Sequence, residues 1–402
     1  MTQEIVRAQQ WPRYRWWVLA NVALVNFLLM GFAWNYLIML VPSVLEDLEL
    51  ELSDWGLLWA ATSLGVCLLA IASGALADRY GVRRVASAGL LLAAASLLMR
   101  LEVSGLASFF VSMLLFGVAL GTLITVLPKA IGVWFPPDQF GMANGVAQSA
   151  FGVGFTIMGL TTPTLAEAFG GWRGLSEWFA WATLAVGAIW LFTVRDRHSL
   201  VEEASLPVLA SVRRVLGVRD VSILALCYGL YMGGYLGATG YLPTFFMGRG
   251  VSADQVGIFF TYSTVSFALS CLILPTLSDW IGRRKVVYCV SIALAGAGIF
   301  ACVASDLPLA LMAICWGGGS GGSVLVFAVP LEMDPPGPSL AGAAVGVAVT
   351  GGFVGGVIGP LIGMSLLEKG PLLGFGFWTS WYFASALFFA LLRETGRAAR
   401  VR

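Results

Sequence analysis

Three side chains in the stretch 106–134 could bind a small charged solute. Thr122, Thr125 and Lys129 are separated by three and four residues in an otherwise apolar run. On a helix this spacing places two hydroxyls and one amine on a single face. A charge inside a membrane span is costly unless it meets water or a partner. Lys129 therefore either attracts an anionic substrate into a cavity or extends toward the nearby helix end and the cytoplasmic interface.

Aromatic and hydroxyl side chains form further stripes of the same kind. Tyr228, Tyr231 and Tyr235 recur at the spacing of one helix face. The equivalent positions in the first apolar run, and a third stripe in the run 308–330, add these candidates: Phe27, Met30 and Trp34; Trp316, Ser320 and Ser323. Such faces suit either a partly polar substrate cavity or helix packing with aromatic anchors at the membrane interface.

The composition indicates what must position these side chains. Of the 402 residues, 58% are hydrophobic and 11% are charged, whereas soluble domains average about 25% charged residues. Apolar runs close to the ~20 residues that cross a bilayer recur along the whole chain. We predict an all-α polytopic membrane protein with twelve transmembrane helices near the following residues: 16–41, 54–77, 85–101, 106–134, 142–168, 176–194, 220–247, 255–278, 286–304, 308–330, 340–367 and 375–392.

The second half of the chain repeats the first. Several residues recur 201 positions later, among them these pairs: Pro42 and Pro243, Asp78 and Asp279, Gly81 and Gly282, Gly117 and Gly318. Parallel repeats of six helices are typical of transporters built from two bundles. We therefore expect two pseudo-symmetric six-helix bundles, with the N-terminal bundle over 1–194, a cytoplasmic central loop over 195–219, and the C-terminal bundle over 220–402.

The basic residues predict how the chain is oriented. Most of the 23 lysines and arginines fall in the N-terminal segment, the central loop and the alternate turns that share their side. The other side holds only Arg100, Arg173, Arg249 and Lys369. Because cytoplasmic loops carry the excess of Lys and Arg, we expect both termini in the cytoplasm and a multi-pass protein of the inner membrane.

Two charged turns occupy equivalent places in the two halves. GALADRYGVRR covers 74–84, between the second and third predicted helices, and PTLSDWIGRRK covers 275–285, between the eighth and ninth. Turns this short require glycine, at Gly81 and Gly282. Asp78 and Asp279 can accept hydrogen bonds from the positive N-terminal end of a neighbouring helix. The arginines can pair with acids or anchor to the anionic inner leaflet.

The first of these turns resembles the signature of the major facilitator superfamily, roughly G-x-L-x-D-R-x-G-R-R. The matching residues are Gly74, Leu76, Asp78, Arg79, Gly81, Arg83 and Arg84. The two halves extend the resemblance over essentially the whole chain. It implies the fold of that superfamily and a conformational latch between the bundles; the alternative is a plain topological anchor. The latch candidates are Gly74, Asp78, Arg79, Gly81, Arg83, Arg84, Asp279, Gly282 and Arg284.

The same resemblance implies that helices one, four, seven and ten surround a central cavity, where the candidate stripes described above would bind substrate. None of the acidic residues lies clearly in the middle of a predicted span. Glu332, at the end of the tenth helix, is the nearest candidate. An ion pair between Lys129 and Glu332 is our hypothesis for an inner gate. In the eleventh helix, glycine at every fourth position from Gly351 predicts a close helix contact.

We expect a secondary transporter working by alternating access, most simply for a small anion such as a monocarboxylate or a cyanate-like ion. The alternative is a carrier or exporter of neutral or amphipathic compounds, including drugs. A channel or a receptor is a third class, and no pattern indicates an enzyme, a metal site or a cofactor. The expected partners are a small-molecule substrate and the bilayer, without nucleic acid, and the expected state is a monomer.

Two subfamily signatures are incomplete in this chain. Drug–proton antiporters of the superfamily carry G-x-x-x-G-P-x-x-G on helix five, but here a similar stretch, GGVIGPLIG, lies on helix eleven. The nitrate carriers use arginines on helices two and eight, and both predicted helices lack them. Neither subfamily's substrate transfers to this chain from these motifs alone.

Overall fold

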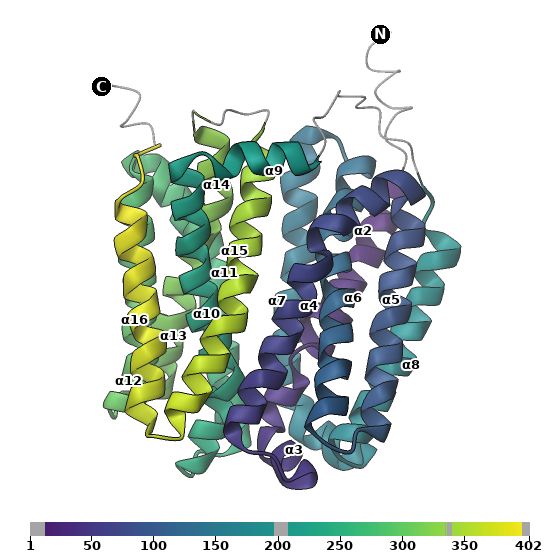
Figure 1. Cartoon of the computed structure of the whole chain (residues 1–402), viewed down its shortest axis with the longest axis vertical. Helices are drawn as coiled ribbons and strands as arrows, with labels where there is room; N and C mark the ends of the chain where they lie inside the picture. The colour runs from purple at the N-terminus through teal and green to yellow at the C-terminus, as the bar shows by residue number, and fades with distance from the viewer. Residues whose placement is uncertain (1–12, 197–207, 334, 336–339, 396–402) are drawn as a thin grey trace. The chain divides into compact units, whose positions relative to one another are not determined.

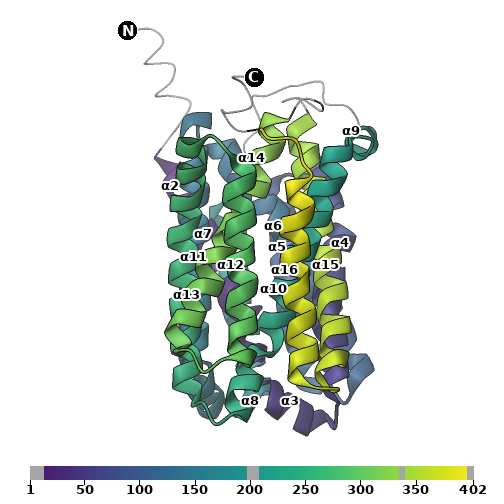
Figure 2. The ribbon, with the colours of Figure 1, turned by 90° about the vertical axis from the view of Figure 1, so that its left-hand side faces the viewer.

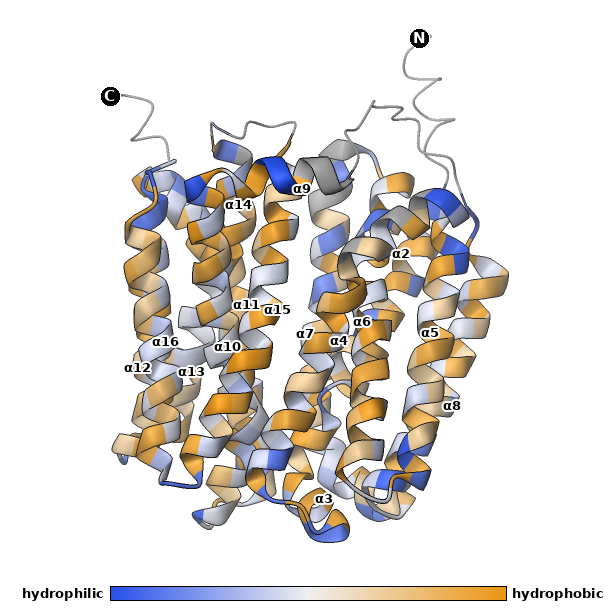
Figure 3. Ribbon diagram, viewed as in Figure 1, coloured by the Kyte–Doolittle hydropathy of each residue, from blue (hydrophilic) through white to orange (hydrophobic). Residues whose placement is uncertain are grey.

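A computed structural model describes residues 13–196, 208–333, 335 and 340–395 (Figure 1). Every regular element in these ranges is a helix, as the sequence predicts. Eleven described segments are long and apolar enough to cross a membrane. A further 33-residue helix, α7 (Pro137–Phe169), occupies the position of the fifth predicted span. Figure 3 shows hydrophobic residues along the middle of the helices and hydrophilic ones near many helix ends.

The chain forms two compact units. The first contains Met1–Leu40 and Gly65–Ala204, and the second contains Val41–Leu64 and Ser205–Arg402. Val41–Leu64, which the expected N-terminal bundle includes, belongs to the second unit. The division into two six-helix bundles stays a prediction. The central segment 197–207 lies outside the described residues, so the predicted central loop is described only in part.

The first unit begins with an interrupted helix and continues with long regular ones. The elements are α2 (Tyr14–Val25), a π-helix (Asn26–Ala33), a 3-10 turn (Tyr36–Met39), α5 (Val82–Met99), a 3-10 turn (Arg100–Glu102), α6 (Leu106–Trp134), α7 and α8 (Gly171–Thr193). The first predicted helix is therefore three successive kinds of helix. Local changes of helical hydrogen bonding of this kind often occur at functional sites.

The second unit contains the remaining elements. They are α3 (Val41–Leu48), α9 (Val208–Leu216), α10 (Arg219–Gly248), α11 (Ala253–Ile281), α12 (Arg284–Ala304), α13 (Leu309–Ser320), a 3-10 turn (Gly321–Val324), α14 (Leu325–Glu332), α15 (Ala341–Leu367) and α16 (Pro371–Ala390). The tenth predicted helix is thus interrupted too. Figure 2 shows α12 and α16 running side by side in this unit.

One helix, α4 (Leu52–Tyr80), belongs to both units. In the second unit, the indole N–H groups of Trp55 and Trp59 donate to the α10 carbonyls of Gly240 and Leu236, at 2.9 and 3.0 Å. In the first unit, Gly65 lies so close to α6 that an added Cβ would sit 2.3 Å from the carbonyl oxygen of Leu114. Each half of α4 is therefore fixed by its own unit.

Glycines let α10 and α15 touch backbone to backbone in the second unit. A Cβ added at Gly355 would fall 1.8 Å from the carbonyl oxygen of Gly229, and one at Gly359 would fall 2.2 Å from that of Gly233. Neither position can hold a side chain without moving a helix. The close helix contact predicted from the glycine repeat is confirmed.

Candidate functional site

The three tyrosines of α10 form a continuous stack. The ring centroids of Tyr228 and Tyr231 are 5.9 Å apart, and those of Tyr231 and Tyr235 are also 5.9 Å apart. Their shared face was predicted from the spacing, and the structure confirms it. Tyr231 is buried, whereas Tyr228 and Tyr235 are partly exposed. The stack is therefore a wall of aromatic surface with accessible members at both ends.

The tenth-helix candidates lie against this stack. The ring of Trp316 is 5.5 Å from that of Tyr235, and the hydroxyl of Tyr231 donates to the carbonyl oxygen of Ser320 at 3.4 Å. The Oγ atom of Ser320 is buried and has no hydrogen-bond partner among the described residues. Ser323 is buried on the following 3-10 turn. The structure thus brings two predicted stripes into one cluster in the second unit.

Tyr382 completes this cluster and was not predicted. It is fully buried on α16, its hydroxyl accepts a hydrogen bond from the indole of Trp316 at 3.0 Å, and its ring meets that of Tyr231 edge to face at 5.8 Å. The last predicted helix carries many aromatics. Periodicity could not single out this one, because the choice depends on which helix packs beside α10.

In the first unit, the helix-one candidates lie at the irregular part of that helix. Phe27 and Met30 fall within the π-helix, and the amide of Trp34 closes a π-type bond to the carbonyl of Leu29 at 2.9 Å. A Cβ added at Gly154 would fall 2.2 Å from the carbonyl oxygen of Phe27, so α7 approaches this segment very closely. Phe27 and Trp34 are partly exposed and Met30 is buried.

The helix-four stripe makes hydrogen bonds to backbone carbonyls. Thr122 donates to Val118, one turn back. The hydroxyl of Thr125 lies 2.9 Å from the carbonyl of Ala70, and the amine of Lys129 donates to the carbonyl of Gly74 at 3.1 Å. Thr125 and Lys129 therefore face α4. Their hydroxyl and amine groups help to hold α6 and α4 together, whatever else they bind.

The first charged turn is built around a glycine conformation and a carboxylate cap. Gly81 has φ 87° and ψ 151°, a conformation almost restricted to glycine. The carboxylate of Asp196 accepts a hydrogen bond from the backbone N–H of Arg83 at 2.9 Å, at the start of α5. The guanidinium of Arg83 donates to the carbonyl of Leu191 at 2.6 Å. Arg79 lies over the ring of Tyr80, and Arg84 is exposed.

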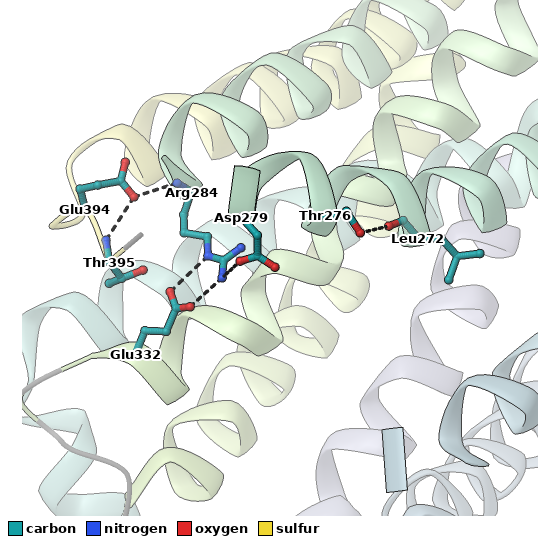
Figure 4. A network of polar contacts seen from close by, with 7 residues as sticks. All are labelled: Leu272, Thr276, Asp279, Arg284, Glu332, Glu394 and Thr395. Atoms are coloured by element: carbon teal, nitrogen blue, oxygen red, sulfur yellow. Dashed lines mark hydrogen bonds and ion pairs between the residues drawn. The ribbon is translucent and has the colours of Figure 1, made fainter. Parts of the chain in front are cut away.

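The second charged turn adds an ion-pair network to the same plan (Figure 4). Gly282 is left-handed, with φ 74° and ψ 12°. One carboxylate oxygen of Glu394 accepts from the backbone N–H of Arg284 at 2.8 Å, and the other accepts from that of Lys285 at 3.3 Å. The guanidinium of Arg284 lies 2.6 Å from oxygens of both Asp279 and Glu332. Arg284 is therefore the centre of a three-residue charge cluster.

The hypotheses of an inner gate and of a conformational latch both involve residues of these turns. Both carboxylate oxygens of Glu332 bind Arg284, and Lys129 belongs to the other unit. The proposed pair between Lys129 and Glu332 stays a prediction. The side chain of Asp78 lies outside the described residues, and Gly74 contributes its carbonyl to Lys129.

Comparison with known proteins places this geometry in a family. The family model of the Major Facilitator Superfamily matches residues 22–360. The probable nitrate/nitrite transporter NarK2 of Mycobacterium tuberculosis is 27% identical over 352 residues, which cover 82% of this chain and 83% of NarK2. The cyanate transport protein CynX of Escherichia coli is 27% identical over 313 residues, covering 76% of this chain and 78% of CynX.

Solved structures agree on the fold. A bacterial homologue of the human lysosomal transporter Spinster, in an inward-facing and unoccupied conformation, aligns with a TM-score of 0.74 at 14% identity over 94% of this chain and 95% of its own. The nucleoside transporter NupG aligns with a TM-score of 0.71 at 15% identity over 93% of this chain and 97% of its own. The family match, the helical architecture and the signature turn agree, and the chain belongs to the Major Facilitator Superfamily.

Proposed function

We propose that this protein is a secondary transporter of a small monovalent anion, of the nitrate, nitrite, cyanate or monocarboxylate kind. Relatives whose names state nitrate/nitrite and cyanate transport align over three quarters or more of this chain. A nitrite extrusion protein of Bacillus subtilis is 25% identical over 73% of this chain. These names favour the anion hypothesis over carriage of neutral compounds.

The observation that carries the proposal is the cation on α6. Lys129 is partly buried within a segment able to span a membrane. Its ammonium group donates to the carbonyl of Gly74 at 3.1 Å, so the charge is held beside α4. An intramembrane ionisable residue is by default a functional candidate, because burying the charge is costly. We propose that a mobile anion binds beside this charge.

The acids of the described spans strengthen the charge argument. In the second unit, Asp279 and Glu332 lie near the end of their helices and share the guanidinium of Arg284. Their negative charge is therefore matched close by, within the same unit. In the tyrosine stack, the hydroxyl of Tyr231 already donates to Ser320, whereas Tyr228 and Tyr235 are partly exposed.

The nitrate carriers of the superfamily use arginines on helices two and eight, which are α4 and α11 in this chain. The described part of α11 contains no arginine, and α4 has one only at its end, Arg79. We infer that this chain would bind its anion through the ammonium group of Lys129 and the α6 hydroxyls of Thr122 and Thr125, all in the first unit. A cyanate-like or carboxylate ion fits these donors as well as nitrate does.

We further propose the mode of action. Transport proceeds by alternating access in a monomer of the inner membrane, with both termini in the cytoplasm and no enzymatic step. The contacts of Trp55 and Trp59 with α10 are candidates for bonds that break and reform in each cycle. The basic residues on the expected cytoplasmic side support the orientation.

The test is uptake by purified protein in liposomes. Nitrate, nitrite, cyanate and formate are supplied separately, and exchange against internal anion is measured. We expect one of them to be carried and Lys129→Ala to reduce its uptake at least tenfold, while Lys129→Arg retains part of it. Lys369→Ala, an exposed lysine outside the stripe, is the matched control. Unchanged uptake of the anion by Lys129→Ala would contradict the proposal.

The aromatic cluster favours a second candidate, carriage of a neutral or amphipathic solute. Tyr228, Tyr235 and Phe327 present partly exposed aromatic surface on the same side of α10. For such a substrate, Tyr235→Ala should abolish transport, whereas Lys129→Ala should leave it nearly intact. The pair of variants therefore separates the two candidates in a single assay.

A further inference from the structure

A buried arginine in the first unit has no role in the site described above. Arg100 was expected among the outer-side charges, yet only 1% of its surface is exposed. Its Nη1 donates to the hydroxyl of Tyr36 at 3.0 Å, and its Nη2 has only the thioether of Met113 at 3.4 Å. The guanidinium carbon lies 4.9 Å from the ring centre of Phe116. Arg100 is therefore buried inside the first unit, whereas its assignment to the outer side stays a prediction.

This cation lacks the partners that usually accompany a buried charge. Its Nε is buried without an acceptor, and no carboxylate within the described ranges pairs with it. Arginine cannot relieve the cost by losing its proton. Contacts with aromatic faces and one phenol recover only part of the lost hydration. Arg100 is therefore a poor choice if the only requirement is a stable bundle.

The second half of the chain shows that the fold does not require this arginine. At the repeat offset of 201 residues, the equivalent position holds Ala301, and the position equivalent to Tyr36 holds Gly237. The arginine and its phenol partner are thus both specific to the first half. A purely architectural need would be expected in both copies.

Arg100 acts on the end of the interrupted first helix. Tyr36 is fully buried and opens the 3-10 turn that follows the π-helix. Its hydroxyl also bonds that of Ser176 on α8. The ring of Phe179, on the same helix, contacts those of Tyr36 and Phe32, at 5.2 and 4.8 Å. Arg100 and Ser176 thus hold Tyr36 from two sides, where regular helical bonding has stopped.

We propose that Arg100 is a positioning residue: through Tyr36 it holds the irregular segment 26–39, and with it Phe27, Met30 and Trp34, in the geometry that faces substrate. The part that concerns substrate rests on the proposed function. The part that concerns the segment stands without it, because a π-helix followed by a 3-10 turn has weaker internal bonding than an α-helix. We call the hydrogen bond between Arg100 and Tyr36 the clamp. It stabilises a segment whose own backbone hydrogen bonds are weaker than those of an α-helix.

Amide hydrogen exchange of the purified full-length protein tests the clamp directly. In Arg100→Met, which keeps the packing volume, exchange over 26–39 should accelerate about tenfold, since a hydrogen bond to a charged group is lost. Tyr36→Phe removes the same bond together with the one to Ser176, and should accelerate exchange at least as much. The double variant should add little to either. Arg100→Lys should restore much of the protection, and Arg249→Met in the second unit is the control.

The transport assay supplies the second readout. For whichever anion the protein carries, Arg100→Met and Tyr36→Phe should raise KM several-fold with Vmax nearly unchanged. A merely structural arginine would lower Vmax and the melting temperature together and leave KM alone. Unchanged exchange over 26–39 in both variants overturns the proposal even if anions are carried. If no anion is carried, the proposed function fails while the exchange result still decides the clamp.

Discussion

The two charged turns share a backbone plan and differ in their charges. In each, a glycine with positive φ precedes a helix whose first N–H groups are capped by an acid from the end of the same half: Asp196 for α5 and Glu394 for α12. The capped residues, Arg83 and Arg284, are repeat equivalents. Their side chains then diverge, since Arg83 reaches a neutral carbonyl and Arg284 binds two carboxylates.

This difference in the side-chain partners of Arg83 and Arg284 distinguishes a cap that both turns share from an acid that only the second half contains. An unpaired helix N-terminus must be satisfied in any half, and both halves do so with a carboxylate. The charge cluster depends on Glu332, whose repeat equivalent is the apolar Ile131. In the described residues the ion-pair network therefore exists in one turn only. The part of the cluster that depends on Glu332 is therefore specific to the second half.

The largest expected effect comes from removing the central arginine. Arg284→Met leaves Glu332 and Asp279 facing each other, and because Glu332 is mostly buried we expect about 3 kcal/mol of destabilisation. Arg83→Met loses one bond to a carbonyl and should cost about 1 kcal/mol. Thermal unfolding of both variants in the same detergent measures the gap. Equal losses would show that the charge cluster contributes no more than the single bond.

The glycines reverse the ranking. Gly81 adopts a conformation nearly closed to other residues, and an added Cβ would lie 2.5 Å from the carboxylate of Asp196. We expect Gly81→Asn to cost about 2 kcal/mol or more. Gly282→Asn should cost less than about 1 kcal/mol, because asparagine tolerates the left-handed conformation. Melting temperatures of the pair decide this, and a larger loss at Gly282 would refute the distinction.

The smallest effect concerns the caps. Neutralising Glu394 with Gln keeps an acceptor but removes the charge from the start of α12, and should cost about 0.5–1 kcal/mol. Asp196→Asn should cost about the same at α5. The two values are compared in low and high salt. Because both caps rest on the same charge–dipole attraction, a clear difference between them would mean that the turns are less alike than their backbones.

The sequence was sufficient for the parts that depend on pattern. Apolar runs predicted the helices, and spacing predicted the shared face of Tyr228, Tyr231 and Tyr235. The two bundles expected from the 201-residue offset stay a prediction. The signature turn predicted the family. Each of these follows from residues close in sequence or from repetition, which need no knowledge of how helices are packed.

The features that the sequence did not predict depend on which helices pack against each other. Spacing placed Thr125 and Lys129 on one face but could not show that this face meets α4. The π-helix within the first span has no signal in hydrophobic periodicity. The burial of Arg100 among the rings of Tyr36 and Phe116 has no signal in the sequence, because it depends on which helices pack beside it.

The sharing of α4 between the two units has a consequence for separating the halves. A polypeptide that ends in the central segment would carry Trp55 and Trp59 away from the α10 carbonyls that receive them. The C-terminal fragment would lack Val41–Leu64, which is part of the second compact unit. Neither half is then a self-sufficient folding module. Two such fragments should regain activity only when they are synthesised together and can complement each other in one membrane.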